Sequence, residues 1–274
     1  MSIKTILLHL ASDENLDSRV EAALGIATQN NAALVGVYSI PPITPPTSFM
    51  GYIPPEYTEQ TLELENKKAL ACKAKLEELA ARVNVPVSVI IEEGYAPDVV
   101  NKYALTADLV VVGQVDPQKS ESAPYLTLIN DLVVSCARPI LAIPYAGNFK
   151  NFGDHILVGW NNTRESSRAI HEAMPFLKAG KKVTLLSINP SKDQSGPDAA
   201  MLAHLERHGV KAECKVGHWK DVSAGNAMLD SLVDYSADML VMGAYGHSRI
   251  REMILGGATQ EILDHMTAPV LFAH

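Results

Sequence analysis

The glycines between residues 243 and 257 are the feature of this sequence with the clearest chemical meaning. A short apolar run at residues 239–242 precedes them and is typical of a strand buried on both faces. A helical pattern begins after Thr259, so the glycines connect a strand to a helix, at positions 243, 246, 256 and 257. Glycine lets a phosphate approach the N–H groups of a helix N-terminus, because it has no Cβ. We expect a phosphate-type ligand here, in preference to a turn that needs glycine only for its dihedral angles.

The rest of the chain alternates between short apolar runs and helical patterns. Strands are expected at residues 6–10, 34–40, 85–91, 109–112, 139–143, 156–158, 183–188, 211–216, 240–242 and 270–272. Helices are expected at residues 16–27, 56–83, 97–105, 125–136, 164–177, 198–208 and 224–235. Pro175 must end or kink the helix that contains it. This alternation predicts parallel sheets covered by helices, with right-handed crossovers.

The order of these elements occurs twice. Residues 107–113, ADLVVVG, match residues 237–243, ADMLVMG, and a proline follows each glycine at the same distance, at positions 139 and 269. The sequence therefore predicts an α/β fold of two tandem doubly wound domains, each a five-stranded parallel sheet with helices on both faces. Their expected bounds are residues 1–147 and 152–274, with a polar, glycine-bearing join at residues 146–153.

The last strand of each half carries an apolar edge, at residues 139–144 and 269–274. An exposed apolar edge invites pairing, so we expect the halves to form a pseudo-twofold pair within the chain. A further homodimer is compatible with this arrangement. Ligands of doubly wound sheets bind at the carboxyl ends of the strands, where the strand order reverses. In the second half this directs attention to residues 160–163, 188–189 and 243–259.

Composition limits the classes of partner. The 274 residues carry a formal net charge of −8, which argues against nucleic acid or an anionic membrane surface as a general partner. The three cysteines are far apart and odd in number, which is typical of reduced thiols in a cytoplasmic protein. No apolar run approaches the roughly 20 residues of a membrane span, and the apolar N-terminal stretch is better interpreted as a first strand than as a signal sequence.

Other motifs give weaker signals. His171-Glu172 begins like the zinc motif HExxH, but Pro175 stands where the second histidine belongs. A second group has zinc-ligand residue types, although exposed histidines on a polar helix are the preferred explanation: His204, His208, Cys214 and His218. The chain has no GxGxxG, no P-loop and no GxSxG sequence. Their absence disfavours dinucleotide oxidoreductases, P-loop hydrolases and serine hydrolases, and the lack of a Ser-Gly-Gly turn disfavours adenylating enzymes.

The spacing of the second-half glycines resembles the nucleotide-binding signature of the universal stress protein family. That signature is Gly, two residues, Gly, nine residues, Gly and then Ser or Thr. Gly243, Gly246 and Gly256 match it, whereas Gly257 takes the place of the hydroxyl residue. With the internal repeat, the chain resembles a tandem member of the family. The resemblance implies an adenine nucleotide (ATP, ADP or AMP, with or without Mg²⁺) at this loop, with its base and ribose near the ends of strands one and two.

The resemblance also implies which residues contact the nucleotide. Family members often carry Asp after strand one, where this chain has Asn161, and Ile188 stands where an apolar residue meets the adenine. The remaining expected contacts are Asn162, Thr163, Met242, Gly243, Gly246, His247, Ser248, Arg249, Gly256, Gly257, Ala258 and Thr259. Arg249 is expected either to pair with a phosphate or to be solvated or paired with a glutamate. Thr259 supplies a hydroxyl only if the helix begins one or two residues late.

The first half departs further from this signature. Gly113 is followed by Gln114, Val115 and Asp116, so an acid replaces the second glycine and would repel a phosphate. We therefore expect nucleotide in the second half only. Three functions stay open: a non-catalytic nucleotide-binding stress protein, which is preferred; a scaffold of the same fold that binds protein partners or another small ligand; and a slow ATPase. The last ranks lowest, because no general base or nucleophile stands out and His247 lacks an orienting carboxylate.

Overall fold

A computed structural model describes residues 2–43, 55–116, 125, 127–190, 199–244 and 257–274. The first half contains β1 Thr5–Leu10, α1 Leu16–Asn30, β2 Ala33–Ile40, α2 Pro55–Val83, β3 Val87–Glu93, α3 Ala96–Ala104, β4 Leu109–Gly113, α4 Leu128–Ser135 and β5 Ile140–Ile143. The second half contains β6 His155–Gly159, α5 Arg164–Glu172, α6 Met174–Ala179, β7 Lys182–Ile188, α7 Ala199–Arg207, β8 Ala212–Gly217, α8 Ala224–Asp234, β9 Met239–Gly243, α9 Gly257–His265 and β10 Val270–Ala273. The predicted α/β class is confirmed.

Most predicted elements differ from the observed ones only at their ends. The helix predicted at residues 164–177 is two helices, because the chain breaks at Ala173 and Pro175 lies in the first turn of α6. Proline lacks the N–H that the interior of a helix requires, whereas the first turn has no use for that N–H. The expected effect of Pro175 is therefore confirmed.

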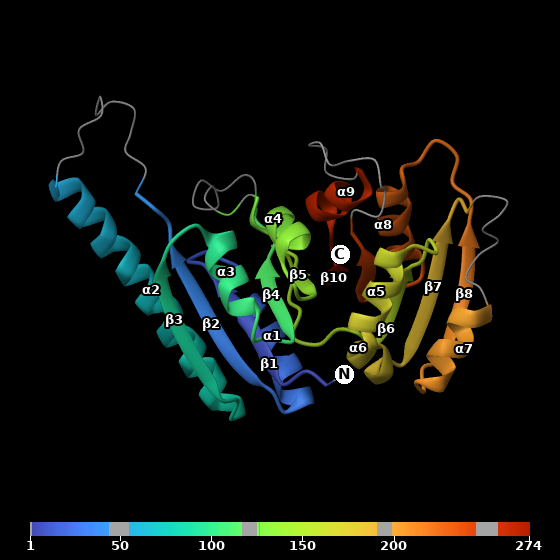
Figure 1. Cartoon of the computed structure of the whole chain (residues 1–274), viewed down its shortest axis with the longest axis horizontal. Helices are drawn as coiled ribbons and strands as arrows, with labels where there is room; N and C mark the ends of the chain where they lie inside the picture. The colour runs from blue at the N-terminus through green and yellow to red at the C-terminus, as the bar shows by residue number, and fades with distance from the viewer. Residues whose placement is uncertain (1, 44–54, 117–124, 126, 191–198, 245–256) are drawn as a thin grey trace.

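The strands of the described residues form one ten-stranded sheet in the order β3-β2-β1-β4-β5-β10-β9-β6-β7-β8 (Figure 1). Each half contributes five parallel strands. The halves meet where β5 and β10 pair antiparallel, with Leu271 opposite Leu141. The predicted five-stranded sheets are thus two parts of one continuous sheet. The expected pairing of the last strands within one chain is confirmed.

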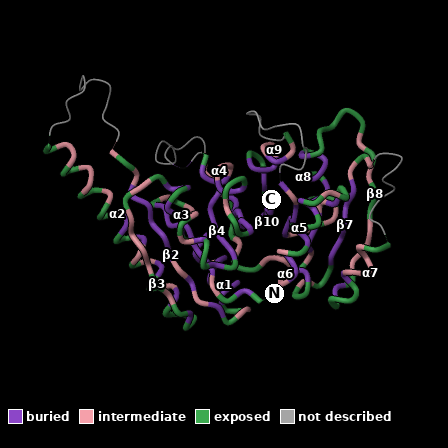
Figure 2. The backbone as a smooth tube through the Cα atoms, in the orientation of Figure 1, coloured by how far each residue is buried: buried purple, intermediate pink, exposed green. Residues whose placement is uncertain are grey.

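Helices cover both faces of the sheet (Figure 1), and most of its strand residues are buried (Figure 2). Each face has its own apolar core. On one face the core includes buried side chains of α1, α2, α5, α6 and α7. On the other face it includes side chains of α3, α4, α8 and α9. In the parts of the chain that the structure describes, no helix is both long enough and apolar enough to span a bilayer.

Polar side chains are buried at the carboxyl end of β1. Arg19 is only 2% exposed and pairs with Asp13 at 3.1 Å between Nη1 and Oδ2. The imidazole of His9 lies edge-on to the ring of Tyr125, with ring centroids 5.1 Å apart. Burial, together with the nearby Arg19 charge, lowers the pKa of His9 from 6.5 to about 3. His9 is therefore a neutral core side chain at neutral pH.

The pairing of β5 with β10 predicts that Leu271 stabilises both halves together. Its side chain is fully buried. We expect Leu271→Ala to lower the free energy of unfolding by about 2–5 kcal/mol, because it removes apolar contacts and leaves a cavity. Urea denaturation followed by circular dichroism measures this. Val216→Ala on the edge strand β8 is the control, since Val216 is exposed, and it should cost no more than about 0.5 kcal/mol. Equal losses in both variants would contradict the central role of this pairing.

The lowered pKa of His9 predicts a loss of stability in acid. Between pH 6.5 and about 3, the unfolded chain binds a proton at His9 that the folded chain does not. The free energy of unfolding should therefore fall by about 2 kcal/mol from this group as the pH drops from 7 to 5. In His9→Phe that part of the pH dependence should disappear, whereas the exposed-residue control His171→Gln should retain it. An unchanged pH dependence in His9→Phe would disprove the assignment.

Candidate functional site

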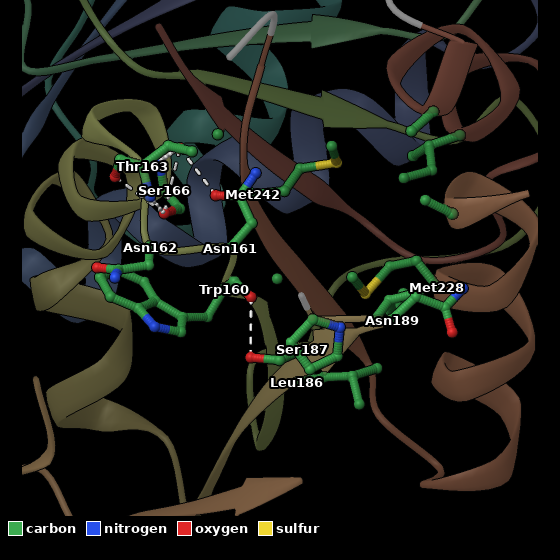
Figure 3. A pocket seen from close by; sticks show the side chains of 17 residues that line it. Trp160, Asn161, Asn162, Thr163, Ser166, Leu186, Ser187, Asn189, Met228 and Met242 are labelled. Carbon is green, nitrogen blue, oxygen red and sulfur yellow. Dashed lines mark hydrogen bonds between the residues drawn. The ribbon is translucent and has the colours of Figure 1, made fainter. Parts of the chain in front are cut away.

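A cavity of about 490 Å³ lies at the carboxyl ends of the second-half strands (Figure 3). Its lining comes from the ends of β6, β7 and β9, from the first turns of α5, α8 and α9, and from Met228 and Ile262 in the second turns of α8 and α9. The lining residues are Gly159, Trp160, Asn161, Asn162, Thr163, Ser166, Leu186, Ser187, Ile188, Asn189, Pro190, Ala224, Met228, Met242, Gly243, Ala258 and Ile262. The central strand β6 lies between β7 and β9, so the cavity is at the point where the strand order reverses.

The turn after β6 forms one side of the cavity. Asn162 has a φ of 56°, a left-handed conformation that asparagine tolerates better than most residues. Thr163 and Ser166 then form a capping box at the start of α5. The Thr163 hydroxyl also donates to Asn161 Oδ1 at 2.8 Å. This bond engages the amide oxygen of Asn161 and leaves its NH₂ group to donate, so Asn161 offers a ligand hydrogen-bond donors where Asp would offer acceptors.

Apolar side chains form the other sides of the cavity. Leu186 and Ile188 come from the end of β7, Met242 from β9, Met228 from α8 and Ile262 from α9. Figure 3 shows Met228 across the cavity from the turn at residues 161–163. Two apolar walls facing a polar turn suit a flat ring that carries polar substituents.

The end of β7 is held by hydrogen bonds. The Ser187 hydroxyl donates to the carbonyl oxygen of Trp160 at 3.0 Å, which joins the ends of β7 and β6. Asn189 exchanges two hydrogen bonds with the backbone of Trp219, at 3.0 and 2.9 Å. These contacts fix the rim of the cavity before any ligand binds.

The electrostatic character of the cavity comes from helix termini. The first turns of three helices line it, through Thr163 of the α5 cap, Ala224 of α8 and Ala258 of α9. Each helix N-terminus carries unpaired N–H groups and a partial positive charge. None of the seventeen lining residues is Asp, Glu, Lys, Arg or His. The described lining side chains are therefore neutral, and the starts of α5 and α9 add positive backbone charge, which favours an anion. At the start of α8 this charge is offset by the Glu261 carboxylate, which accepts from the Ser223 hydroxyl at 2.6 Å.

Glu165 lies just outside this lining, in the first turn of α5. Its carboxylate is paired with Arg164, with 2.9 Å between Oε1 and Nη2. Burial raises the pKa of Glu165, but hydrogen bonds from its own N–H, from Arg164 and from Thr163 outweigh that effect and lower the pKa. The ion pair compensates the one acidic charge at this helix start.

Two glycines allow the close packing and the open space around the cavity. A Cβ on Gly243 would lie 2.4 Å from the carbonyl carbon of Glu165, so only glycine lets the start of α5 pack on the end of β9. A Cβ on Gly159 would lie 3.0 Å from Met228 Cε. A larger side chain at position 159 would therefore occupy the space between β6 and α8.

The structure brings together several residues predicted from the sequence. Asn161, Asn162, Thr163, Ile188, Met242, Gly243 and Ala258 all line the cavity. Gly257 is exposed at the start of α9 and Thr259 is buried inside it, and neither lines the cavity. Gly257 is already helical, so the late start that would present the Thr259 hydroxyl is not observed. Gly246, His247, Ser248, Arg249 and Gly256 lie outside the described residues.

Other lining residues were not predicted. The sequence does contain a signal for Ser166, because this residue stands three positions after Thr163, which is the spacing of a helix capping box. Ala224 and Met228 carry none, because α8 meets the cavity only through tertiary packing. Among the four residues considered for zinc, the rings of His204 and His208 lie 4.7 Å apart. The described residues contain no cluster of three or more metal-binding side chains.

The equivalent position in the first half is filled by side chains. Leu8 pairs with Val111 as Val158 pairs with Val241, so His9 corresponds to Gly159. The His9 imidazole, packed against Tyr125, takes the space that Gly159 leaves open. Arg19 covers the end of β4, with Nη1 2.1 Å from where a Cβ on Gly113 would lie. The first-half position is therefore occupied by the protein's own side chains, a stronger obstacle than the acidic loop residue considered above.

Comparisons with known proteins agree with this architecture. A curated relative, universal stress protein Slr1230 from Synechocystis sp. (strain ATCC 27184 / PCC 6803 / Kazusa), is 41% identical over 69 residues, 24% of this chain. The matched part is only 22% of that relative, so its activity as a whole is not transferred.

Two solved structures are similar over 99% of this chain. One is a universal stress protein from Archaeoglobus fulgidus DSM 4304, with a TM-score of 0.75, 14% identity and 96% of its own chain covered. The other is a functionally unknown protein, PA1789, from Pseudomonas aeruginosa PAO1, with a TM-score of 0.60, 15% identity and 92% covered. At these identities they show the fold alone. The model of the universal stress protein family matches residues 2–122 and 153–274. Since these matches span most of both halves, the chain belongs to the universal stress protein family.

Proposed function

We propose that this protein binds an adenine nucleotide in the second-half cavity and acts as a stress-response or regulatory protein without strong catalysis. The observation that carries the proposal is the convergence of three helix N-termini on a neutral, partly apolar cavity. In this proposal the domains are residues 1–147 and 152–274, the second alone holds the ligand, and the protein is cytoplasmic.

The roles of the described residues follow from their chemistry. The adenine ring lies between the apolar walls made by Ile188 and Met228. The NH₂ group of Asn161 donates to a ribose or phosphate oxygen. The first-turn N–H groups of α5 and α9 face the phosphates, which carry Mg²⁺ when the nucleotide is bound as its magnesium complex.

Affinity should be modest, with AMP or ADP bound at least as well as ATP. Asn161 and Gly257 remove two polar contacts that the family signature implies, each worth about 0.5–1.5 kcal/mol net. Together they weaken binding roughly tenfold or more. Hydrolysis should be negligible, because no described lining residue can act as a general base. A slow ATPase therefore remains the weakest of the three hypotheses.

Asn161 and Gly257, the two departures from the family signature, also favour the second candidate function, a scaffold that has lost its nucleotide. The two hypotheses differ in what the purified protein carries. Mass spectrometry of the small molecules released by denaturing the native protein should detect an adenine nucleotide under the first hypothesis. If none is released and calorimetry detects no binding of AMP, ADP or ATP, the scaffold hypothesis replaces it.

Gly159 provides a test of the cavity as the binding site. We expect Gly159→Val to weaken AMP binding at least about tenfold, because the added side chain meets Met228 and fills the space beside β6. Isothermal titration calorimetry measures the affinity. Ala212→Val is the matched control, since it adds a larger aliphatic side chain to the edge strand β8, away from the cavity, and should leave affinity unchanged. Thermal unfolding checks that both variants are folded. Native affinity in a folded Gly159→Val protein would place the nucleotide elsewhere.

Gly257 provides a test of the missing hydroxyl. Apart from its chain neighbours and its own helix backbone, no atom of the described residues would lie within 4 Å of a Cβ at this position, so Gly257→Ser fits among them. The serine hydroxyl at the start of α9 should strengthen ATP binding by about threefold to tenfold, the value of one hydrogen bond to a phosphate. Gly257→Ala is the control, because it adds the Cβ without the hydroxyl. Equal affinities of the Ser and Ala variants would show that the hydroxyl does not limit binding.

A further inference from the structure

Helix α9 of the second half lies at the junction of the two halves, in contact with α4 of the first half (Figure 1). It has nine residues, and a helix of this length is marginally stable by itself in water, so its placement depends on its packing contacts. Ala258 in its first turn lines the candidate nucleotide cavity, and the first-turn N–H groups have no partners within the helix. The contacts that hold α9 therefore determine where these N–H groups point.

One set of contacts comes from α8 in the same half. The backbone of Gly225 lies close to that of α9, since a Cβ at this position would be 2.9 Å from the carbonyl oxygen of Ala258. The Ser223 hydroxyl at the start of α8 donates to Glu261 Oε2 at 2.6 Å. The side chain of Ile262 is buried between the two helices and the sheet. These contacts hold the first two turns of α9.

A second set of contacts comes from the first half. Gln114, directly after β4, is buried, and its Nε2 donates to the carbonyl oxygen of Leu263 at 2.6 Å. Leu263 is among the last four residues of α9, whose carbonyl groups lack partners within the helix, so Gln114 caps the end of α9. The other end of the amide is also fixed, because Oε1 accepts from the N–H of Tyr145 at 3.1 Å. Asn130 of α4 adds a longer contact, donating through Nδ2 to Gln260 Oε1 at 3.3 Å.

The internal repeat shows that the Gln114 contact is specific to one half. Gln114 and Ala244 each follow the glycine that ends the matching strand, β4 or β9. Their backbone N–H groups make equivalent hydrogen bonds, to Ile143 at 2.7 Å and to Ala273 at 2.9 Å. The methyl group of Ala244 cannot donate a hydrogen bond, so this position of the second half offers α4 no equivalent cap. The side chain of Gln114 therefore supports the other half of the chain and not its own.

We propose that Gln114 of the first half is a positioning residue for the candidate nucleotide site of the second half, an inference that rests on the function proposed above. By binding the carbonyl oxygen of Leu263, Gln114 holds α9 with its first-turn N–H groups toward the phosphate. Leu263 is six residues after Gly257, about 9 Å along the helix axis, so Gln114 acts through α9 without touching the nucleotide. The first half, whose own site is filled by side chains, thereby contributes to binding in the second.

The variant Gln114→Met tests this role in the full-length protein, because methionine has a similar volume and cannot donate to Leu263. Calorimetry with AMP and with adenosine separates the contribution of the phosphate from that of the rest of the ligand. AMP binding should weaken about threefold to tenfold, the value of one hydrogen bond, whereas adenosine binding should change less than about twofold. Asn101→Ala is the matched control and should change neither affinity, since it removes an amide that donates to Ser135 at 2.7 Å within the first half.

A second measurement needs no ligand. Amide hydrogen exchange at residues 261–265 should become about threefold to tenfold faster in Gln114→Met, because α9 loses a cap, and it should stay unchanged in α5. Thermal unfolding checks that each variant is folded. If Gln114→Met does not fold, Asn130→Ala replaces it. This variant removes the other hydrogen bond from the first half to α9 and should weaken AMP binding about twofold while leaving adenosine binding unchanged.

The outcomes separate the positioning role from the proposed function. If the native protein does not bind AMP, the proposed function fails and the role of Gln114 fails with it. If the native protein binds AMP, three results would overturn the positioning role alone. They are native AMP affinity in a folded Gln114→Met protein, equal losses of AMP and adenosine affinity, and unchanged hydrogen exchange in α9.

Discussion

The antiparallel pairing of β5 with β10 is the contact on which the whole architecture depends. Each half of the sheet ends in a strand of four buried residues whose outer backbone groups need partners. The two strands satisfy each other, with Leu141 opposite Leu271 at the centre. The same pairing brings α4 and α9 together, where Asn130 meets Gln260. Each universal stress protein domain would expose this strand edge if it stood alone, and here the edge is covered by the other domain of the same chain.

The two copies differ because one strand position holds different side chains. Gly159 leaves a cavity beside Met228, whereas His9 and Tyr125 fill the equivalent space in the first half. Burial of His9 is tolerated because its imidazole stays neutral, its pKa lowered by burial and by Arg19. Similar backbones thus support an open site in one half and a packed core in the other. Fold alone does not decide which copy binds a ligand.

Much of the fold could be predicted from the sequence, because buried parallel strands are continuous apolar runs. In addition, the segment ADLVVVG at residues 107–113 is repeated as ADMLVMG at residues 237–243. The turn at residues 161–163 was also predictable, since it follows a strand at a switch point. The contact of Met228 with the cavity could not be predicted, and neither could the filling of the equivalent space by His9 and Tyr125. Both depend on strand register and on how the helices pack on the sheet. The sequence predicted two separate five-stranded sheets and not one continuous sheet. An apolar strand edge indicates that the edge has a partner, but it does not indicate whether the two strands pair by backbone hydrogen bonds or in which direction they run.

The nine-residue helix α9 meets the candidate nucleotide cavity with its N-terminal part. Ala258, in its first turn, and Ile262, one turn further, line this cavity. A helix dipole favours an anion at its N-terminus and a cation at its C-terminus. Because the net charge of the protein is −8, its average field would repel the proposed anion, so a local positive potential is needed at the site. In the proposed complex, that potential comes from backbone dipoles at a lining without acidic side chains, which act over a few ångströms, whereas the more distant surface carboxylates are screened by solvent and salt.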